Sequence, residues 1–119
     1  MGLKIEYEPN DVCVMRFSGI LKQSEFAAEQ GTIARQIDGG SKPRLLVVAE
    51  NFEGWERGAD WNDLDFMIAY GDEIAKIAIV GEPEWEAKAL AFAGGGVRRA
   101  PVKFFPPNEL GQARGWLAE

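Results

Sequence analysis

Strands are predicted wherever hydrophobic residues alternate with polar ones or form a short unbroken run. Leu3, Ile5 and Tyr7 alternate with charged residues, which is the pattern of a strand exposed on one face. The run 45–49 lacks polar alternation, which predicts a strand covered on both faces in the middle of a mostly parallel sheet. The predicted strands span residues 3–7, 12–19, 45–49, 76–80 and 102–105.

Between most of these strands, apolar residues return at helical spacing. Helices are expected at residues 24–37, from 55–58 to 70, from 83 to the glycines at 94–96, and at 108–117. Ser24 and Asn108 are predicted to be N-caps, and Pro83 suits a first helical turn. Residues 50–55 are predicted to form an acidic, aromatic turn that leads into the second helix.

The predicted order of elements is ββαβαβαβα. Turn residues at 9–11 require the first two strands to form an antiparallel hairpin. Strands that alternate with helices indicate right-handed crossovers, so we expect an α/β fold with a mostly parallel sheet and helices packed on it. The length of 119 residues predicts one domain over residues 1–119.

Aromatic and glycine positions at loop entries resemble those of a known family. The segments that carry the resemblance are 51–55, 77–81 with Trp85, 103–105 and 113–117. They resemble the SpoIIAA-like family, also described as STAS/SEC14-like, over essentially the whole chain. The resemblance implies a STAS-type fold and a bacterial cytoplasmic domain whose biochemical role is mostly unassigned.

The chain departs from one well-known property of the STAS group. Anti-sigma-factor antagonists of that group carry a phosphorylated serine at the start of the helix after the central strand. The corresponding residues 52–61 contain no serine or threonine. A phosphorylation switch at that position is therefore not expected.

Composition and charge exclude several classes of function. The net charge of −6 argues against a sequence-independent nucleic-acid binder, which needs a basic surface. No apolar run approaches the roughly 20 residues of a membrane-spanning helix. The lone Cys13 cannot form an intrachain disulfide, and its place within a strand predicts a buried thiol rather than a reactive one. We therefore expect a cytoplasmic protein that inserts in no membrane.

Candidate catalytic chemistry is sparse. The absence of histidine excludes Ser-His-Asp and Cys-His arrangements and imidazole ligation of a metal, and no calcium-loop spacing is present. No catalytic residue, cofactor or metal site is therefore predicted. The alternative to a binding module is a small hydrolase or isomerase that uses Glu53 with Asp60 or Asp63. The competing interpretation of these acids is a solvated face.

Two further segments have both a functional and a purely structural interpretation. Arg98 and Arg99, after a glycine run, are a candidate anion contact, but a helix stop followed by a loop is the favoured interpretation of the run. The helix expected after Trp55 has a second apolar stripe, opposite the one assigned to the sheet, formed by Ala59, Phe66, Met67 and Tyr70. This stripe predicts a homodimer contact, with a ligand wall or burial against another helix of the same chain as the alternatives.

The aromatic residues give the clearest functional prediction. Phe52, Trp55 and Trp85 follow the two strands predicted to be central, so they should converge at one end of the sheet. The predicted binding rim comprises Phe52, Glu53, Gly54, Trp55, Trp61 and Trp85. The other interpretation is that these rings close the end of the core. Together these observations favour a non-enzymatic binding or regulatory module that takes a protein partner or a small apolar ligand.

Overall fold

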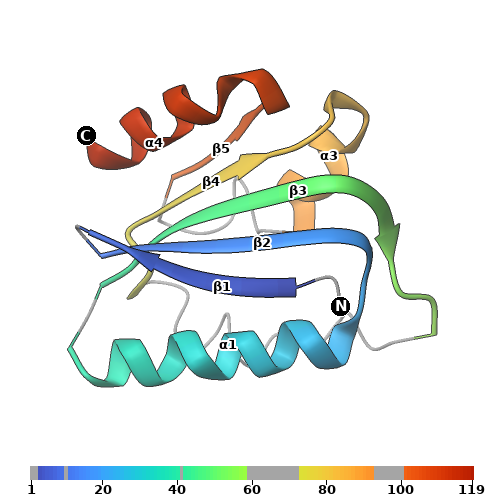
Figure 1. The fold of residues 1–119 in the computed structure, drawn as a ribbon. Helices are drawn as coiled ribbons and strands as arrows, with labels where there is room; N and C mark the ends of the chain where they lie inside the picture. Colours follow the sequence, from blue (N-terminus) through green and yellow to red (C-terminus); the bar gives the residue numbers. More distant parts are fainter. Residues whose placement is uncertain (1–2, 10, 41, 59–72, 93–100) are drawn as a thin grey trace.

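The computed structural model describes residues 3–9, 11–40, 42–58, 73–92 and 101–119. Its described strands form one five-stranded sheet in the order β1-β2-β3-β4-β5 (Figure 1). The strands are β1 (Leu3–Glu8), β2 (Val12–Leu21), β3 (Arg44–Trp55), β4 (Lys76–Val80) and β5 (Val102–Phe105). The helical elements are α1 (Gln23–Asp38), η2 (Pro83–Trp85), α3 (Glu86–Phe92), η3 (Pro107–Glu109) and α4 (Leu110–Ala118).

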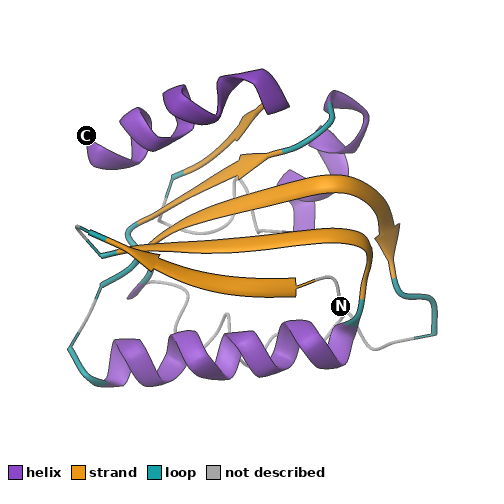
Figure 2. Ribbon diagram, viewed as in Figure 1, coloured by secondary structure: helices purple, strands orange, loops and turns teal. Residues whose placement is uncertain are grey.

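The pairing of the strands confirms the predicted topology. β1 and β2 form an antiparallel hairpin, in which Ile5 lies opposite Met15. β2, β3, β4 and β5 then pair in parallel. The α/β fold with its N-terminal hairpin is therefore as expected, and Figure 2 shows the helices on either side of the sheet.

Side chains alternate between two faces of the sheet, and each face has its own core. On the α1 face, strand residues such as Cys13 and Ile77 pack with Ile33 and Ile37 of α1. On the α4 face, the buried residues are Val14, Leu46, Val48, Ala78, Val80 and Phe105 with Ala113 and Leu117 of α4. Figure 1 shows α1 and α4 on opposite sides of the sheet. The unbroken apolar run in β3 is explained, because both of its faces are covered.

β3 does not end where the sequence predicts. The predicted turn at residues 50–55 is wrong, because the strand continues to Trp55 and stays paired with β2. Two irregularities in the register accommodate the extra length, since Ser18 lies opposite Glu50, whereas Gly19 lies opposite Phe52. Asn51 has a positive φ of 50°, which is typical of a bulge rather than of regular strand. Residues that are typical of turns thus form bulges within a longer strand.

The predicted N-caps are also wrong. The α1 helix begins at Gln23, and its N-cap residue Lys22 makes no side-chain capping hydrogen bond. Instead, the Gln23 amide donates to Glu56 Oε1, just after β3, at 3.1 Å. Asn108 lies inside a 3₁₀ turn that precedes α4. The Glu56 carboxylate thus replaces a capping side chain and ties α1 to the segment that follows the central strand.

The third and fourth helical segments follow the prediction more closely. Pro83 opens a 3₁₀ turn that leads into α3, as its place in the sequence indicated. Lys76 Nζ donates to the Trp116 carbonyl oxygen at 2.9 Å, which satisfies a carbonyl in the last turn of α4. Most of the helix predicted from residues 55–58 to 70 lies outside the described residues, as do the glycines at 94–96. Trp55, where that helix was predicted to begin, belongs to β3 instead.

Candidate functional site

The end of β3 extends beyond its neighbour β4. Pairing between the two strands covers Arg44 to Val48 of β3, opposite Lys76 to Val80 of β4. Beyond that point the described partner of β3 is β2 alone. In Figure 1 this part of β3 curves past the end of β4. The extension carries Phe52 and Trp55 to the carboxyl end of the parallel strands, where open α/β sheets commonly bind ligands.

Three aromatic rings meet there, and we call Phe52, Trp55 and Trp85 the rim cluster. The Phe52 ring centroid lies 5.0 Å from that of Trp55 and 4.9 Å from that of Trp85. The two indoles are 6.0 Å apart, and all three pairs are edge-to-face, which is a favourable geometry for aromatic rings. β3 supplies two of the rings, and η2, which follows β4, supplies the third. The sequence prediction that these rings converge describes the observed arrangement.

The rim cluster is continuous with the core and is also partly exposed. The Phe52 ring lies 5.2 Å from that of Phe17, and Phe52 and Trp55 pack against the buried cluster of the α1 face. All three rim residues are nevertheless only half-buried. The Trp85 indole nitrogen is buried and has no hydrogen-bond acceptor among the described residues. The rings therefore close one end of the core and present the rest of their surface outward.

Gly54 allows the Trp85 ring to lie against the β3 backbone. It is buried, its φ is +116°, and a Cβ built on it would lie 3.6 Å from Trp85 Cη2. Residues with a side chain rarely adopt that φ, and a side chain longer than alanine's would meet the indole. Glycine at this position thus sets the spacing between β3 and η2.

The surroundings of the rim cluster are acidic. Glu53 is exposed on the β3 bulge, and Glu82, Glu84 and Glu86 are exposed around Trp85. Lys88 Nζ lies 5.7 Å from the Trp85 ring centroid, so a cation already rests over one face of this indole. The sequence prediction included Glu53 but missed Glu82, Glu84, Glu86 and Lys88, because these residues become relevant only through the contact between η2 and β3.

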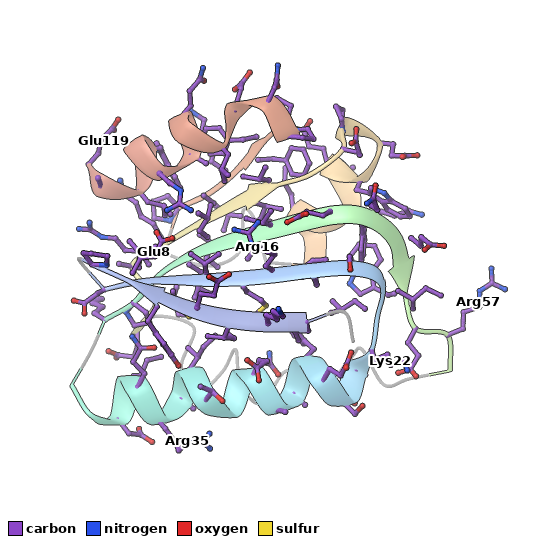
Figure 3. The ribbon with its side chains drawn as sticks, viewed as in Figure 1. Glu8, Arg16, Lys22, Arg35, Arg57 and Glu119 are labelled. Atoms are coloured by element: carbon purple, nitrogen blue, oxygen red, sulfur yellow. The ribbon has the colours of Figure 1, made fainter. Side chains whose placement is uncertain are left out.

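The remaining predicted site residues lie outside the described part of the chain. These are Ala59, Asp60, Trp61, Asp63, Phe66, Met67, Tyr70, Arg98 and Arg99. Within the described part, Phe52, Gly54, Trp55 and Trp85 come together, whereas Glu53 is exposed and its carboxylate lies toward Gly19 of β2. Arg57, shortly after β3, extends away from the molecule (Figure 3).

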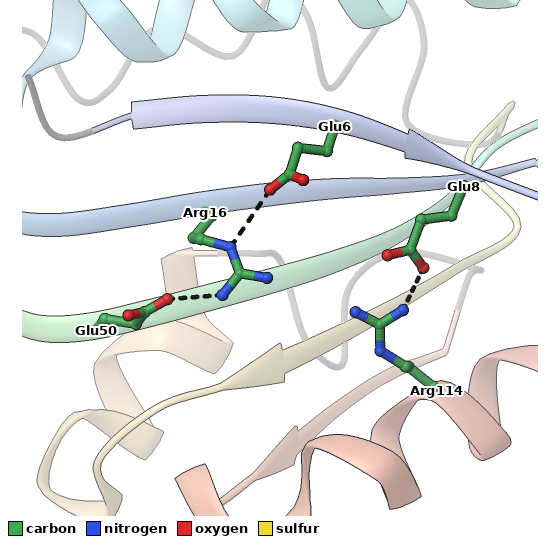
Figure 4. Close-up of polar contacts among 5 residues, drawn as sticks. All are labelled: Glu6, Glu8, Arg16, Glu50 and Arg114. Atoms are coloured by element: carbon green, nitrogen blue, oxygen red, sulfur yellow. Dashed lines mark hydrogen bonds and ion pairs between the residues drawn. The ribbon is translucent and has the colours of Figure 1, made fainter.

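Ion pairs on the α4 face link β1, β2 and β3 to one another and β1 to α4. Arg16 Nη1 lies 2.7 Å from Glu50 Oε1, and Arg16 Nε lies 3.5 Å from Glu6 Oε1 (Figure 4). Glu8 pairs with Arg114 of α4. The bond to Glu50 raises the pKa of Arg16. These pairs depend on strand register, which is why sequence reasoning did not identify them.

Cys13 is fully buried, and burial raises the pKa of its thiol to about 11. Relative to an ordinary thiol pKa of 9.0, this shift lowers the thiolate fraction about 100-fold near pH 8. We expect the folded protein to react with a disulfide reagent such as dithionitrobenzoate only as fast as it unfolds, and the denatured protein to react at once. Rapid reaction of the native protein would contradict this assignment of Cys13 to the core.

The same thiol predicts a contribution to the pH dependence of stability. Its pKa is higher in the folded state than in the unfolded state, so the thiol stabilises the fold below the unfolded value. That contribution is lost as the pH rises from 9.0 towards about 11. The difference in unfolding free energy between wild type and Cys13→Ala should therefore shrink over this interval.

Other features of the described residues do not suggest a second site. They contain no group of histidine, cysteine, aspartate or glutamate side chains placed to hold a metal ion. No helix among them is long and apolar enough to cross a bilayer. An open hollow of about 540 Å³ lies at the amino ends of the parallel strands and is lined by Asp11, Lys42, Arg44, Ala75 and Ala118. It has charges of both signs and no aromatic ring, so the rim cluster is the stronger candidate.

Comparison with known proteins agrees with this architecture. No curated protein matches the chain. The crystal structure of an uncharacterised protein of the DUF3478 family from Shewanella loihica PV-4, described as having a SpoIIAA-like fold, superposes with a TM-score of 0.70. The match covers 97% of this chain and 91% of that one at 22% identity, so it shows the fold alone. The SpoIIAA-like family model matches residues 12–118. This chain therefore belongs to the SpoIIAA-like family.

Proposed function

We propose that this protein is a non-enzymatic cytoplasmic binding module that receives an apolar group at the rim cluster. The group belongs to a small ligand or to a side chain of a protein partner. The observation that carries the proposal is the meeting of Phe52, Trp55 and Trp85 at the carboxyl end of the sheet, half-buried and in mutual contact. Such a surface offers aromatic contact area at a position that suits ligand binding.

The charges around the rim cluster favour a neutral or cationic group over an anion. Glu82, Glu84 and Glu86 flank Trp85 and are exposed, so they would repel a carboxylate or phosphate. Lys88 over the Trp85 ring supports a cation as an acceptable neighbour of this indole. An apolar amine or a basic amphipathic segment of a partner fits both properties.

The carboxylate-dependent enzyme receives less support. A general acid or base of that kind needs a partly buried carboxyl group with a neighbour that perturbs it. Glu53 is exposed, and its expected partners Asp60 and Asp63 lie outside the described residues. We therefore do not propose a hydrolase or isomerase activity.

Native mass spectrometry of gently purified protein tests the proposal. We expect an adduct or a co-purified partner on wild type that is lost in Trp85→Ala and kept in Trp116→Ala. Trp116 is a matched control, because it is also half-buried but packs on Phe105, on the α4 face. Loss of the bound species from both variants, or from neither, would contradict a site at the rim cluster.

A further inference from the structure

β1 lies at one edge of the sheet and presents an edge that nothing else in the described chain covers. Its described pairing is with β2 alone, over Leu3 to Glu8. An unpaired edge exposes a row of N–H and C=O groups that can pair with another strand. Tyr7 on this strand is 57% exposed, which is high for a large apolar side chain. The free edge of β1 thus has unpaired backbone groups, and the strand carries an exposed aromatic ring on one face.

We propose that β1 pairs antiparallel with β1 of a second copy of this chain, with Ile5 opposite Ile5. The pairing would join the two sheets across a two-fold axis. This inference is independent of the rim cluster, and its surface differs from the apolar stripe at residues 59–70.

The geometry of strand pairing allows few registers. Two identical antiparallel strands must bring residues of the same face opposite each other, which restricts the register to steps of two residues. With Ile5 opposite Ile5, Lys4 lies opposite Glu6 of the second copy, and Glu6 lies opposite its Lys4. The symmetric pair therefore gains two cross-strand contacts of opposite charge. On the other face, Leu3 lies opposite Tyr7 of the second copy and covers part of this exposed ring.

The neighbouring registers are less favourable. A step in one direction places Lys4 opposite Lys4. A step in the other places Glu6 opposite Glu6, with Lys4 opposite Glu8. Like charges directly opposite each other destabilise a strand pair. Glu8 is moreover already engaged by Arg114 of α4. The register centred on Ile5 is the only one of these three in which opposite charges face each other throughout.

Glu6 is paired with Arg16, but its side chain is 56% exposed and can therefore also contact a second cation. The shortest contact of Arg16 is to Glu50, at 2.7 Å, whereas Arg16 Nε is 3.5 Å from Glu6 Oε1. Figure 4 shows Glu6 reaching from β1 toward Arg16. Lys4 of the second copy would thus complete a charge pattern of alternating sign across the joined sheets.

Sedimentation velocity at low salt, on the full chain, tests this interface. We expect wild type to form a concentration-dependent dimer. Lys4→Glu or Glu6→Lys should each raise the dissociation constant at least about tenfold, because each change puts two like-charge pairs across the axis. The double variant Lys4→Glu/Glu6→Lys should dimerise again, and an equal mixture of the two single variants should form a heterodimer. Glu109→Lys, an equal charge change in η3, which follows β5 at the opposite edge of the sheet, should leave dimerisation unaltered.

Each contrary outcome overturns a stated part of the inference. A wild-type monomer at high concentration would overturn the pairing. A dimer that both single variants retain would place the interface elsewhere, as with the stripe at residues 59–70. Dimerisation lost in both single variants and not restored in the double variant would exclude the register centred on Ile5. Since the rim variants are not involved, these results leave the binding proposal untouched.

Discussion

Replacing Leu117 with alanine should lower the free energy of unfolding by about 3 kcal/mol, within the range of large-to-small core substitutions. Leu117 is 0% exposed and packs with Leu46 and Ala78 on the α4 face. Helix α4 is the described helix whose buried residues belong to this core. The cavity would therefore lie between α4 and the sheet, where little can move in to fill it. Urea denaturation followed by circular dichroism would measure the loss.

Leu110→Ala is the matched control for this substitution. Leu110 lies on the same helix and contacts the same cluster, but it is only half-buried. We expect a loss of roughly 1 kcal/mol, since less apolar surface is removed from contact. Equal losses of stability for the two variants, or a smaller loss for Leu117→Ala than for Leu110→Ala, would contradict the assignment of α4 to a core of its own.

Gly54→Val should destabilise the protein by about 3 kcal/mol and change the tryptophan fluorescence spectrum. A β-branched residue at a φ of +116° is strained, which costs on the order of 1–3 kcal/mol. The added methyl groups would also meet the Trp85 ring, because the Cβ position is only 3.6 Å from Cη2. The ring would have to move away from β3, which alters its environment and hence its emission.

Gly58→Val separates the two causes. Gly58 also has a positive φ, +78°, but a Cβ there would meet no atom of the described residues within 4 Å. It should therefore show the backbone strain without the crowding, with a smaller loss of stability and an unchanged emission spectrum. If the two valine variants behave alike, Gly54 does not set the spacing between β3 and η2.

Much of the fold follows from the pattern of residues, whereas its irregular parts do not. The apolar run 45–49 identifies the central strand, because a strand covered on both faces has no polar alternation. Residues 50–55 mislead, since asparagine and glycine suit turns as well as bulges. These residues form bulges and not a turn because β2 continues to Leu21 and pairs with them. The two strands are far apart in the sequence, so a local pattern does not reveal this pairing.

The candidate site likewise has parts that the sequence predicts and parts that it does not. Phe52, Trp55 and Trp85 could be placed together because the ends of neighbouring parallel strands meet at one edge of a sheet. The cap that Glu56 provides for α1 could not be foreseen, because it joins residues 33 positions apart. Ser24 met the local rule for a cap, yet a distant carboxylate took that role.

The central claim is that the rim cluster binds an apolar group, and fluorine NMR tests it most directly. The protein would be labelled with 5-fluorotryptophan, assigned through single tryptophan-to-phenylalanine variants and titrated with the neutral apolar dye Nile red. We expect saturable shifts of the Trp55 and Trp85 resonances, whereas the resonance of Trp116, on the opposite face of the sheet, should not shift. Unchanged Trp55 and Trp85 resonances at saturating dye, or a shift confined to Trp116, would contradict the central claim.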